Sequence, residues 1–172
     1  TIKENIMNLR KLALLAFLAA LFAFPAEAQF YGNINQPTQH TCLSDVMYRE
    51  AGILRDKGMR AVGHAVINRT KDRRFPNTIC EVVYHKLNGM PQFQWTVFRN
   101  LPPKDPAMYA QAKNIATEIL NNDSTDATKN AVFFTIVTDG WFGGAIYKGD
   151  IILTLTIGPK RFYKFKSFLT KG

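Results

Sequence analysis

Helical periodicity dominates the chain after residue 40, and runs typical of strands come only near its end. Apolar residues recur at helical spacing in residues 41–54, 57–70 and 105–120. Residues 131–137 and 151–157 are rich in β-branched side chains and are expected to form strands. Because the helices come first and a small β element comes late, the sequence predicts a mainly helical α+β fold. This order does not fit the βαβ arrangement of nucleotide-binding domains.

Glu50 interrupts the apolar face of the first of these helices. The apolar residues on that face are Leu43, Val46, Met47, Ala51 and Leu54. A carboxylate that points toward a core loses water, which disfavours its charged form. Because general acid catalysis requires a carboxylic acid that keeps its proton near neutral pH, Glu50 is a candidate catalytic acid. Its position alone also fits a glutamate paired with arginine, or one at the edge of the core.

The 28 N-terminal residues have the pattern of an export signal. Arg10 and Lys11 precede an uncharged apolar run, 12–24, and Ala28 ends a small-x-small cleavage site. The run is shorter than the roughly 20 residues of an ordinary membrane-spanning helix. We therefore expect translation to start at Met7 and the signal peptide to be cleaved, with a retained N-terminal anchor as the alternative.

The chain is basic, with a formal net charge of +9. In an exported protein this charge favours an anionic extracellular polymer, such as cell wall or lipopolysaccharide, or lipid headgroups as the partner. We expect no nucleic acid partner, because no binding motif for one is present. We also allow for a transient membrane contact through the N-terminal segment, and nothing in the sequence points to an oligomer, so we expect a monomer.

The two cysteines, Cys42 and Cys80, are expected to form one disulfide in an oxidising compartment. The bond would tie the Glu50 helix to residues 79–84, and closing such a loop could add roughly 3–4 kcal/mol of stability. The three histidines are scattered and show no ligand spacing, so we expect no metal and no cofactor. His64, beside the apolar face of the second helix, is interpreted as a packed histidine.

Four short sequence motifs follow one another along the chain. They are MYREA at 47–51, AVGHAVINR at 61–69, FPNTICEVVY at 75–84 and QFQWT at 92–96. In this order and spacing they resemble the SleB-type cell-wall hydrolases, the family of the spore-cortex-lytic enzymes. The resemblance runs from about Cys42 to Tyr163 and includes the paired cysteines.

This resemblance implies a lysozyme-like, transglycosylase-type domain that acts on the glycan strands of peptidoglycan, with Glu50 as the catalytic acid. We expect a linker at 29–41, the catalytic domain at 42–165 and a basic tail at 166–172. The protein would act outside the cytoplasm, in the periplasm, the cell wall or the extracellular space. The sequence leaves open whether it serves a bacterium remodelling its wall or a phage as an endolysin.

The chain departs from the family pattern at two positions. Thr135 follows the paired aromatics Phe133 and Phe134, where family members often carry a histidine. Lys160 replaces the histidine of the closing Ile-Gly-x-His-x-Phe-Tyr pattern. Residues 140–151, with Trp141 and Phe142 in a glycine-rich loop, also match poorly, so the substrate subsites are where we expect this chain to differ.

The expected reaction is cleavage of the bond between N-acetylmuramic acid and N-acetylglucosamine. An ordinary glycosidase needs a second carboxylate. Asp45 is expected on the solvated side of the Glu50 helix, which leaves Glu81 as the best candidate because the disulfide brings its segment close. A lytic transglycosylase needs only one carboxylate, because the muramic acid C6 hydroxyl attacks C1 internally. The sequence therefore favours a lytic transglycosylase, with a hydrolytic muramidase as the alternative.

Residues 92–96 are the predicted sugar-binding segment. Phe93 and Trp95 could stack on sugar rings while Gln92 and Thr96 bond to polar groups, although both aromatics would also suit a core. Tyr84 and Tyr163 could orient the substrate or Glu50, or make ordinary buried hydrogen bonds. Two other functions compete with the enzyme: an exported peptidoglycan-binding module without turnover, and a lysis protein that perturbs membranes.

Overall fold

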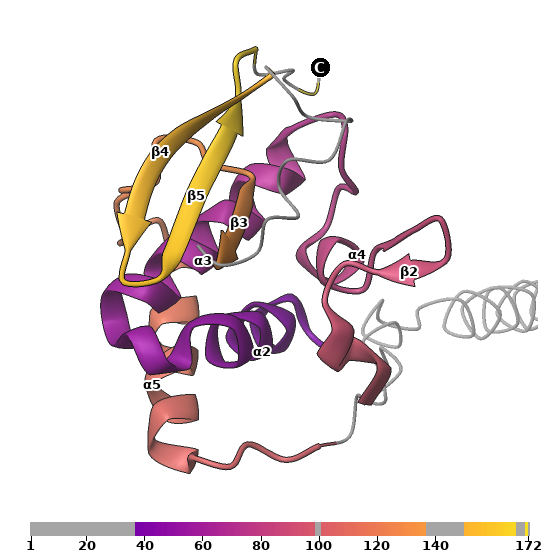
Figure 1. Ribbon diagram of the computed structural model, residues 1–172. Coiled ribbons are helices and arrows are strands. Elements are labelled where there is room, and N and C mark those ends of the chain that lie inside the picture. The colour runs from indigo at the N-terminus through magenta and orange to yellow at the C-terminus, as the bar shows by residue number, and fades with distance from the viewer. Residues whose placement is uncertain (1–36, 99–100, 137–149, 168–170, 172) are drawn as a thin grey trace, which may run out of the picture. The chain divides into compact units, whose positions relative to one another are not determined.

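The computed structural model describes residues 37–98, 101–136, 150–167 and 171, all within the unit 37–172. The predicted signal peptide, most of the linker, part of the tail, and Trp141 and Phe142 lie outside these residues. The elements, drawn in Figure 1, are α2 (Gln39–Ala51), η2 (Gly52–Leu54), α3 (Arg55–Lys71), α4 (Ile79–Val83), β1 (Lys86–Leu87), β2 (Met90–Pro91), η3 (Gln94–Phe98), α5 (Pro106–Leu120), β3 (Phe133–Ile136), β4 (Ile151–Ile157) and β5 (Lys160–Phe165). The prediction of an α+β fold with helices first is confirmed.

Three helices, α2, α3 and α5, pack against one another and carry most of the core. The hydroxyl of Thr38 caps α2 by accepting from the backbone N–H of Thr41, at 3.1 Å. The helices meet closely at Gly63, where a Cβ would lie 2.6 Å from Ile119 Cδ1 and from Met47 Sδ. A larger residue there would force the side chains of Ile119 and Met47 to move, so Gly63 allows the three helices to pack closely.

The predicted boundaries of the first two helices differ from the observed ones. Helix α2 begins at Gln39 and ends at Ala51, and a short 3-10 turn, η2, separates it from α3. The prediction continued the helix to Leu54 because this residue keeps the apolar spacing. Arg55, the C-cap residue of η2, has a φ of 57°, and at this residue the chain changes direction and enters α3.

Residues 86–91 form a small hairpin. Strands β1 and β2 pair with Lys86 opposite Pro91 and Leu87 opposite Met90. Asn88 and Gly89 form the two-residue turn, with φ of 51° and 79°. An Asn-Gly pair is the strongest short signal for such a turn, so this hairpin was readable from the sequence.

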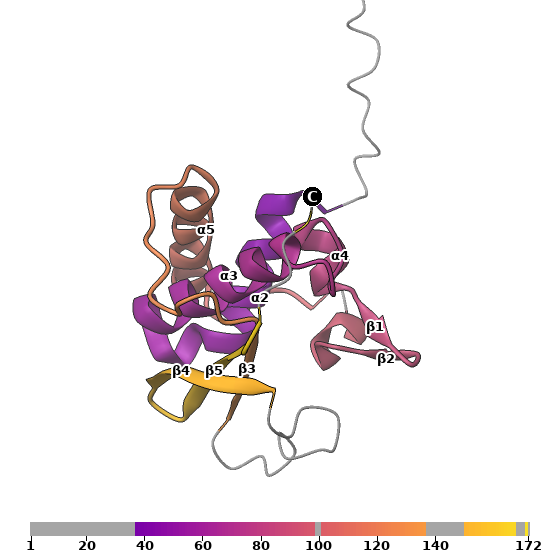
Figure 2. The ribbon, with the colours of Figure 1, turned by 90° about the horizontal axis from the view of Figure 1, so that it is seen from above.

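The late strands form a three-stranded antiparallel sheet in the order β3-β5-β4. Gly158, with φ of 54°, turns β4 into β5, so that Ile157 pairs with Lys160 at the start of the central strand. Figure 2 shows the sheet along one side of α2 and α3. Phe162, fully buried, packs the sheet onto the helical core.

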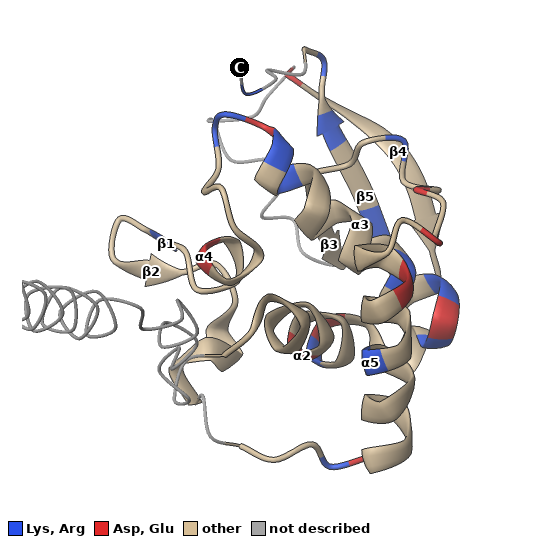
Figure 3. Cartoon of the chain, turned by 180° about the vertical axis from the view of Figure 1, so that it is seen from behind, with Lys and Arg blue, Asp and Glu red and all other residues tan. Residues whose placement is uncertain are grey.

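Charged side chains are unevenly distributed over the described elements. Figure 3 shows basic residues along β5 and at the C-terminal end of α3.

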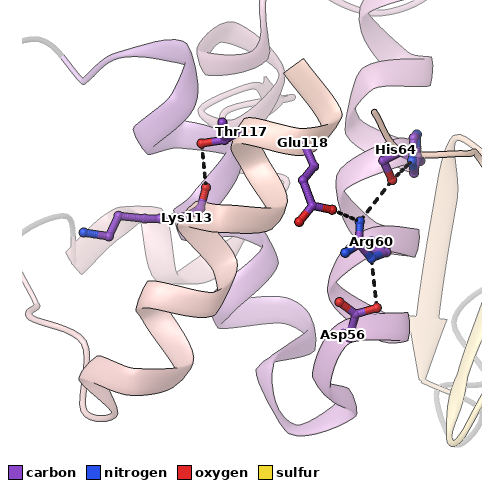
Figure 4. Close-up of polar contacts among 7 residues, drawn as sticks. Asp56, Arg60, His64, Lys113, Thr117 and Glu118 are labelled. Carbon is purple, nitrogen blue, oxygen red and sulfur yellow. Dashed lines mark hydrogen bonds and ion pairs between the residues drawn. The ribbon is translucent and has the colours of Figure 1, made fainter. Parts of the chain in front are cut away.

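A group of ion pairs joins α3 to α5. Its central residue, Arg60, contacts Asp56 at 2.8 Å and Glu118 at 2.5 Å (Figure 4). None of the helices in the described part of the chain is long and apolar enough to cross a membrane.

Candidate active site

Glu50 lies in the last turn of α2, where three elements distant in sequence meet. Its Oε1 accepts a hydrogen bond from the indole Nε1 of Trp95, in η3, at 3.1 Å. Its Oε2 lies 3.6 Å from Nζ of Lys160, the first residue of β5. The carboxyl group is therefore held at both oxygens, while its side chain keeps 24% of its surface exposed. An ion pair of the kind considered for Glu50 is present, formed with a lysine of the sheet and not with an arginine.

A row of aromatic rings connects Trp95 to the sheet. Trp95 stacks on Phe93 with ring centroids 6.2 Å apart, and Phe93 stacks on Phe134 of β3 at 6.0 Å. Phe134 contacts Phe162 of β5 at 5.9 Å. Because this row packs η3 against β3 and β5, it fixes the distance between the two side chains that hold Glu50.

Two arginines lie over the rings of this row. The guanidinium of Arg49 sits 5.1 Å from the ring centroid of Trp95 and donates to the carbonyl of Leu101 at 2.5 Å. Arg69 is buried and lies 5.5 Å over Phe93 and 5.7 Å over Phe134. Cations over aromatic faces are favourable, more so when desolvated, so both arginines stabilise the row that carries Trp95.

The other residues of the predicted sugar-binding segment occupy different environments. Phe93 is 5% exposed and belongs to the core, the second of the two interpretations that its sequence position allowed. Thr96 is also buried, and its hydroxyl donates to the carbonyl of Phe93 at 2.6 Å. Gln92 is exposed and Trp95 is partly exposed. Of these four residues, Trp95 is the one that the structure brings onto Glu50.

The two predicted tyrosines lie on separate elements. Tyr84 is the C-cap residue of α4 and packs, partly buried, against the core. Tyr163 lies in β5, where it pairs with Phe133 of β3 and with Leu153 of β4. Neither position assigns a role in catalysis.

The sequence predicted that Asp45 lies on the solvated face of α2, and this prediction is wrong. It is partly buried and accepts a hydrogen bond from the hydroxyl of Tyr109, in α5, at 2.8 Å. Burial raises the pKa of Asp45 above its ordinary value and raises the pKa of Tyr109 to about 12. At five residues from Glu50, Asp45 projects about 140° away around the helix, so the two carboxyl groups do not face each other.

Glu81, the other candidate for a second carboxylate, caps α4. Its Oε2 accepts from the backbone N–H of Thr78 at 3.1 Å and from the hydroxyl of Thr78 at 2.9 Å. The Thr78 hydroxyl in turn accepts from the backbone N–H of Glu81, which completes a capping box. This arrangement explains Glu81 as a structural residue.

The disulfide between Cys42 and Cys80 is present, as predicted, and joins α2 to α4 with 5.3 Å between the Cα atoms. Within the described ranges, no group of three or more His, Cys, Asp or Glu side chains is placed to hold a metal ion. His64 is buried and shares a hydrogen bond of 2.9 Å with the hydroxyl of Ser124. It is a packed histidine, as its position beside the apolar face predicted.

Sequence reasoning missed the role of Lys160 as a partner of Glu50. Lys160 was recognised only as a replacement for a histidine. The signal that could have placed it is the alternation in β5, because Phe162 faces the core and residues two apart share a face. The other replacement, Thr135, lies on β3 opposite Arg161, outside the contacts given above for Glu50.

The described residues thus form a mainly helical α+β domain with one glutamate held between a helix, a 3-10 turn and a sheet. The model of the cell wall hydrolase family matches residues 55–163, more than half of the chain. The chain therefore belongs to the cell wall hydrolase family, and the resemblance to this family is confirmed. It is an enzyme that acts on peptidoglycan, as predicted. The matched segment begins after Glu50, so the match itself does not include this residue.

Two solved structures are similar to this chain. The catalytic domain of the germination-specific lytic transglycosylase SleB from Bacillus anthracis aligns with a TM-score of 0.54 and 20% identity, covering 77% of this chain and 98% of that one. The catalytic domain of the Bacillus cereus SleB protein aligns with a TM-score of 0.49 and 21% identity, covering 76% and 94%. The first likeness supports the fold. A comparison with curated proteins found no match.

Proposed function

We propose that the protein is a lytic transglycosylase that cleaves the bond between N-acetylmuramic acid and N-acetylglucosamine, with Glu50 as its single catalytic carboxylate. The proposal rests on the contacts of Glu50: Trp95 donates to one carboxyl oxygen and Lys160 lies near the other, while the side chain stays partly exposed. Glu81, the second carboxylate that the sequence put forward, caps α4, and Asp45, which the sequence set aside, bonds to Tyr109. A reaction that needs one carboxylate fits this arrangement better than one that needs two.

In the proposed reaction Glu50, in its protonated form, gives its proton to the glycosidic oxygen as the bond to C1 breaks. An oxocarbenium-like transition state forms at C1. The C6 hydroxyl of the muramic acid then attacks C1 and gives its proton to the carboxylate of Glu50. The glutamate is regenerated, and the new chain end is a 1,6-anhydromuramic acid.

Substrate binding is proposed for the partly exposed and exposed members of the predicted set. Trp95 would contact the sugar next to the cleaved bond, because its indole already lies against the carboxyl of Glu50. Gln92 would bond to N-acetyl or hydroxyl groups. For Thr96, Tyr84 and Tyr163 we propose a supporting role, in which they hold the segments that carry Trp95 and Lys160.

We further propose that residues 1–28 direct export and that the enzyme acts in the periplasm, the cell wall or the extracellular space. The basic charge suits an anionic polymer. The protein would work as a monomer on glycan strands, without nucleic acid, with a transient membrane contact through the N-terminal segment as an added option.

One observation favours a second candidate, an exported peptidoglycan-binding module without turnover. Glu50 pairs with a lysine whose side chain is 6% exposed, and this contact alone could explain a partly buried glutamate. A module of this kind would keep its wall binding when Glu50 is changed.

The test is mass spectrometry of the soluble fragments released from purified peptidoglycan by the protein and by Glu50→Gln. Fragments that end in anhydromuramic acid, absent with the variant, are the expected result. Reducing muramic ends would instead indicate the hydrolytic muramidase, and the search for a second carboxylate would begin with Glu81. Wall binding without fragments from either protein would favour the binding module.

A further inference from the structure

Lys160 is a buried cation at the candidate site. Its side chain is 6% exposed, and Nζ lies 3.6 Å from Glu50 Oε2 and 4.6 Å over the ring of Phe134. An ammonium ion removed from water is costly unless it is paired. Glu50 is the anionic partner that the geometry supplies, so Lys160 holds the carboxyl from the sheet side.

Lys160 and Trp95 together restrict the orientation of the Glu50 carboxyl group. Trp95 donates to one oxygen, and Lys160 lies against the other. The terminal torsion of a glutamate is broad when it is unrestrained. Contacts at both oxygens narrow that range, which is how a proton donor is kept in one productive geometry.

Lys160 also sets the charge next to Glu50. Several other charged and titratable groups on α2 and on the elements packed against it have different partners. Arg49 contacts Leu101 and Trp95, Tyr109 contacts Asp45, Arg60 contacts Asp56 and Glu118, and Glu81 caps α4. An opposite charge within about 4–6 Å favours the charged form of a carboxyl group, so in the described residues Lys160 is the cation placed to act on Glu50.

We propose that Lys160 is a positioning residue of this enzyme, which orients Glu50 and stabilises the carboxylate that forms when Glu50 gives up its proton. The proposal rests on the lytic transglycosylase function stated above. In the first step the proton moves to the glycosidic oxygen, and the negative charge left on Glu50 faces the ammonium of Lys160. In the second step Glu50 recovers a proton from the C6 hydroxyl.

Two variants separate the charge of Lys160 from its contact. Lys160→Met removes both, whereas Lys160→Gln removes the charge and keeps a hydrogen-bond donor. Lys166→Met, an exposed lysine just beyond β5, is the matched control. Release of anhydromuramic fragments is measured for each protein, with kcat and KM determined separately.

Lys160→Met should lower kcat by about tenfold with little change in KM, because the orienting contact with Glu50 is lost. Lys160→Gln should recover part of this loss, because its amide can still donate a hydrogen bond to the carboxyl group. A kcat of Lys160→Met that equals that of Lys166→Met would overturn the proposal.

A second measurement separates this inference from the proposed function. A double-mutant cycle in thermal stability uses Glu50→Gln, Lys160→Met and the combined variant, and it needs no activity. Coupling between the two positions is expected, because each single variant already removes the contact between Glu50 and Lys160. If the native protein releases no fragments, the proposed function fails while the cycle still reports on the contact. Additive effects of the two changes would overturn the pairing itself.

Discussion

Two groups of charged residues lie against the same helical core, and they differ in how far their side chains are exposed to solvent. At Arg60, one guanidinium meets two carboxylates, Asp56 and Glu118, and all three side chains are substantially exposed. At Glu50, one carboxylate meets a lysine that is almost fully buried, and an indole N–H holds its other oxygen. Exposed ion pairs contribute little, whereas a buried ammonium depends on its partner. The comparison shows that burial of a charged partner distinguishes the candidate active site from the surface ion pairs at Arg60. The number of charged residues does not.

The largest expected effect is that of Glu50→Gln on activity. We expect fragment release to fall on the order of 10³-fold, because proton transfer in both steps passes through this carboxyl. Glutamine keeps an acceptor for Trp95 and has nearly the same size, so the folded state should persist. Peptidoglycan digestion gives the rate, and circular dichroism checks the fold. A variant that retains most of its activity would exclude Glu50 as the catalytic acid.

The next effect is that of Trp95→Phe. The change keeps the aromatic row but removes the N–H that donates to Glu50 Oε1. We expect kcat to fall by about tenfold, the equivalent of one hydrogen bond to a carboxylate. Steady-state kinetics on peptidoglycan fragments would measure the change. An effect confined to KM would instead mean that Trp95 serves only as a surface for the sugar.

Arg60→Met tests the other side of the comparison. Asp56 and Glu118 raise the pKa of Arg60 further above its already high value, chiefly through hydrogen bonds. Because the group is exposed, we expect the free energy of unfolding to fall by less than about 1 kcal/mol and kcat to stay unchanged. Chemical denaturation and the fragment assay measure the two quantities. A large loss of activity would mean that the two charged groups are coupled through α3.

The sequence predicted that Glu50 lies on a helix, but it did not show which residues contact its carboxyl group. The helix that carries Glu50 was predictable because its apolar spacing depends on residues a few positions apart. Trp95 and Lys160 reach Glu50 across 45 and 110 positions of chain, respectively, and such contacts depend on how η3 and β5 pack. Asp45 was misplaced for the same reason, since its partner Tyr109 comes from α5. The family resemblance supplied the fold, but it could not supply a contact made by a residue that departs from the family pattern.

The smallest expected effect concerns His64, which extends the Arg60 group through Ser124 (Figure 4). Burial lowers the pKa of His64 below its ordinary value of 6.5. The unfolded chain therefore binds this proton more readily than the folded one, and stability should fall as the pH drops below about 6.5 and on through the folded value. His64→Gln keeps a polar partner for Ser124 but removes the titration, so its stability should change less over the same interval. Thermal denaturation between about pH 7 and pH 5 compares the two proteins, since most carboxylates titrate lower. Parallel curves would show that the protonation of His64 does not differ between the folded and unfolded states.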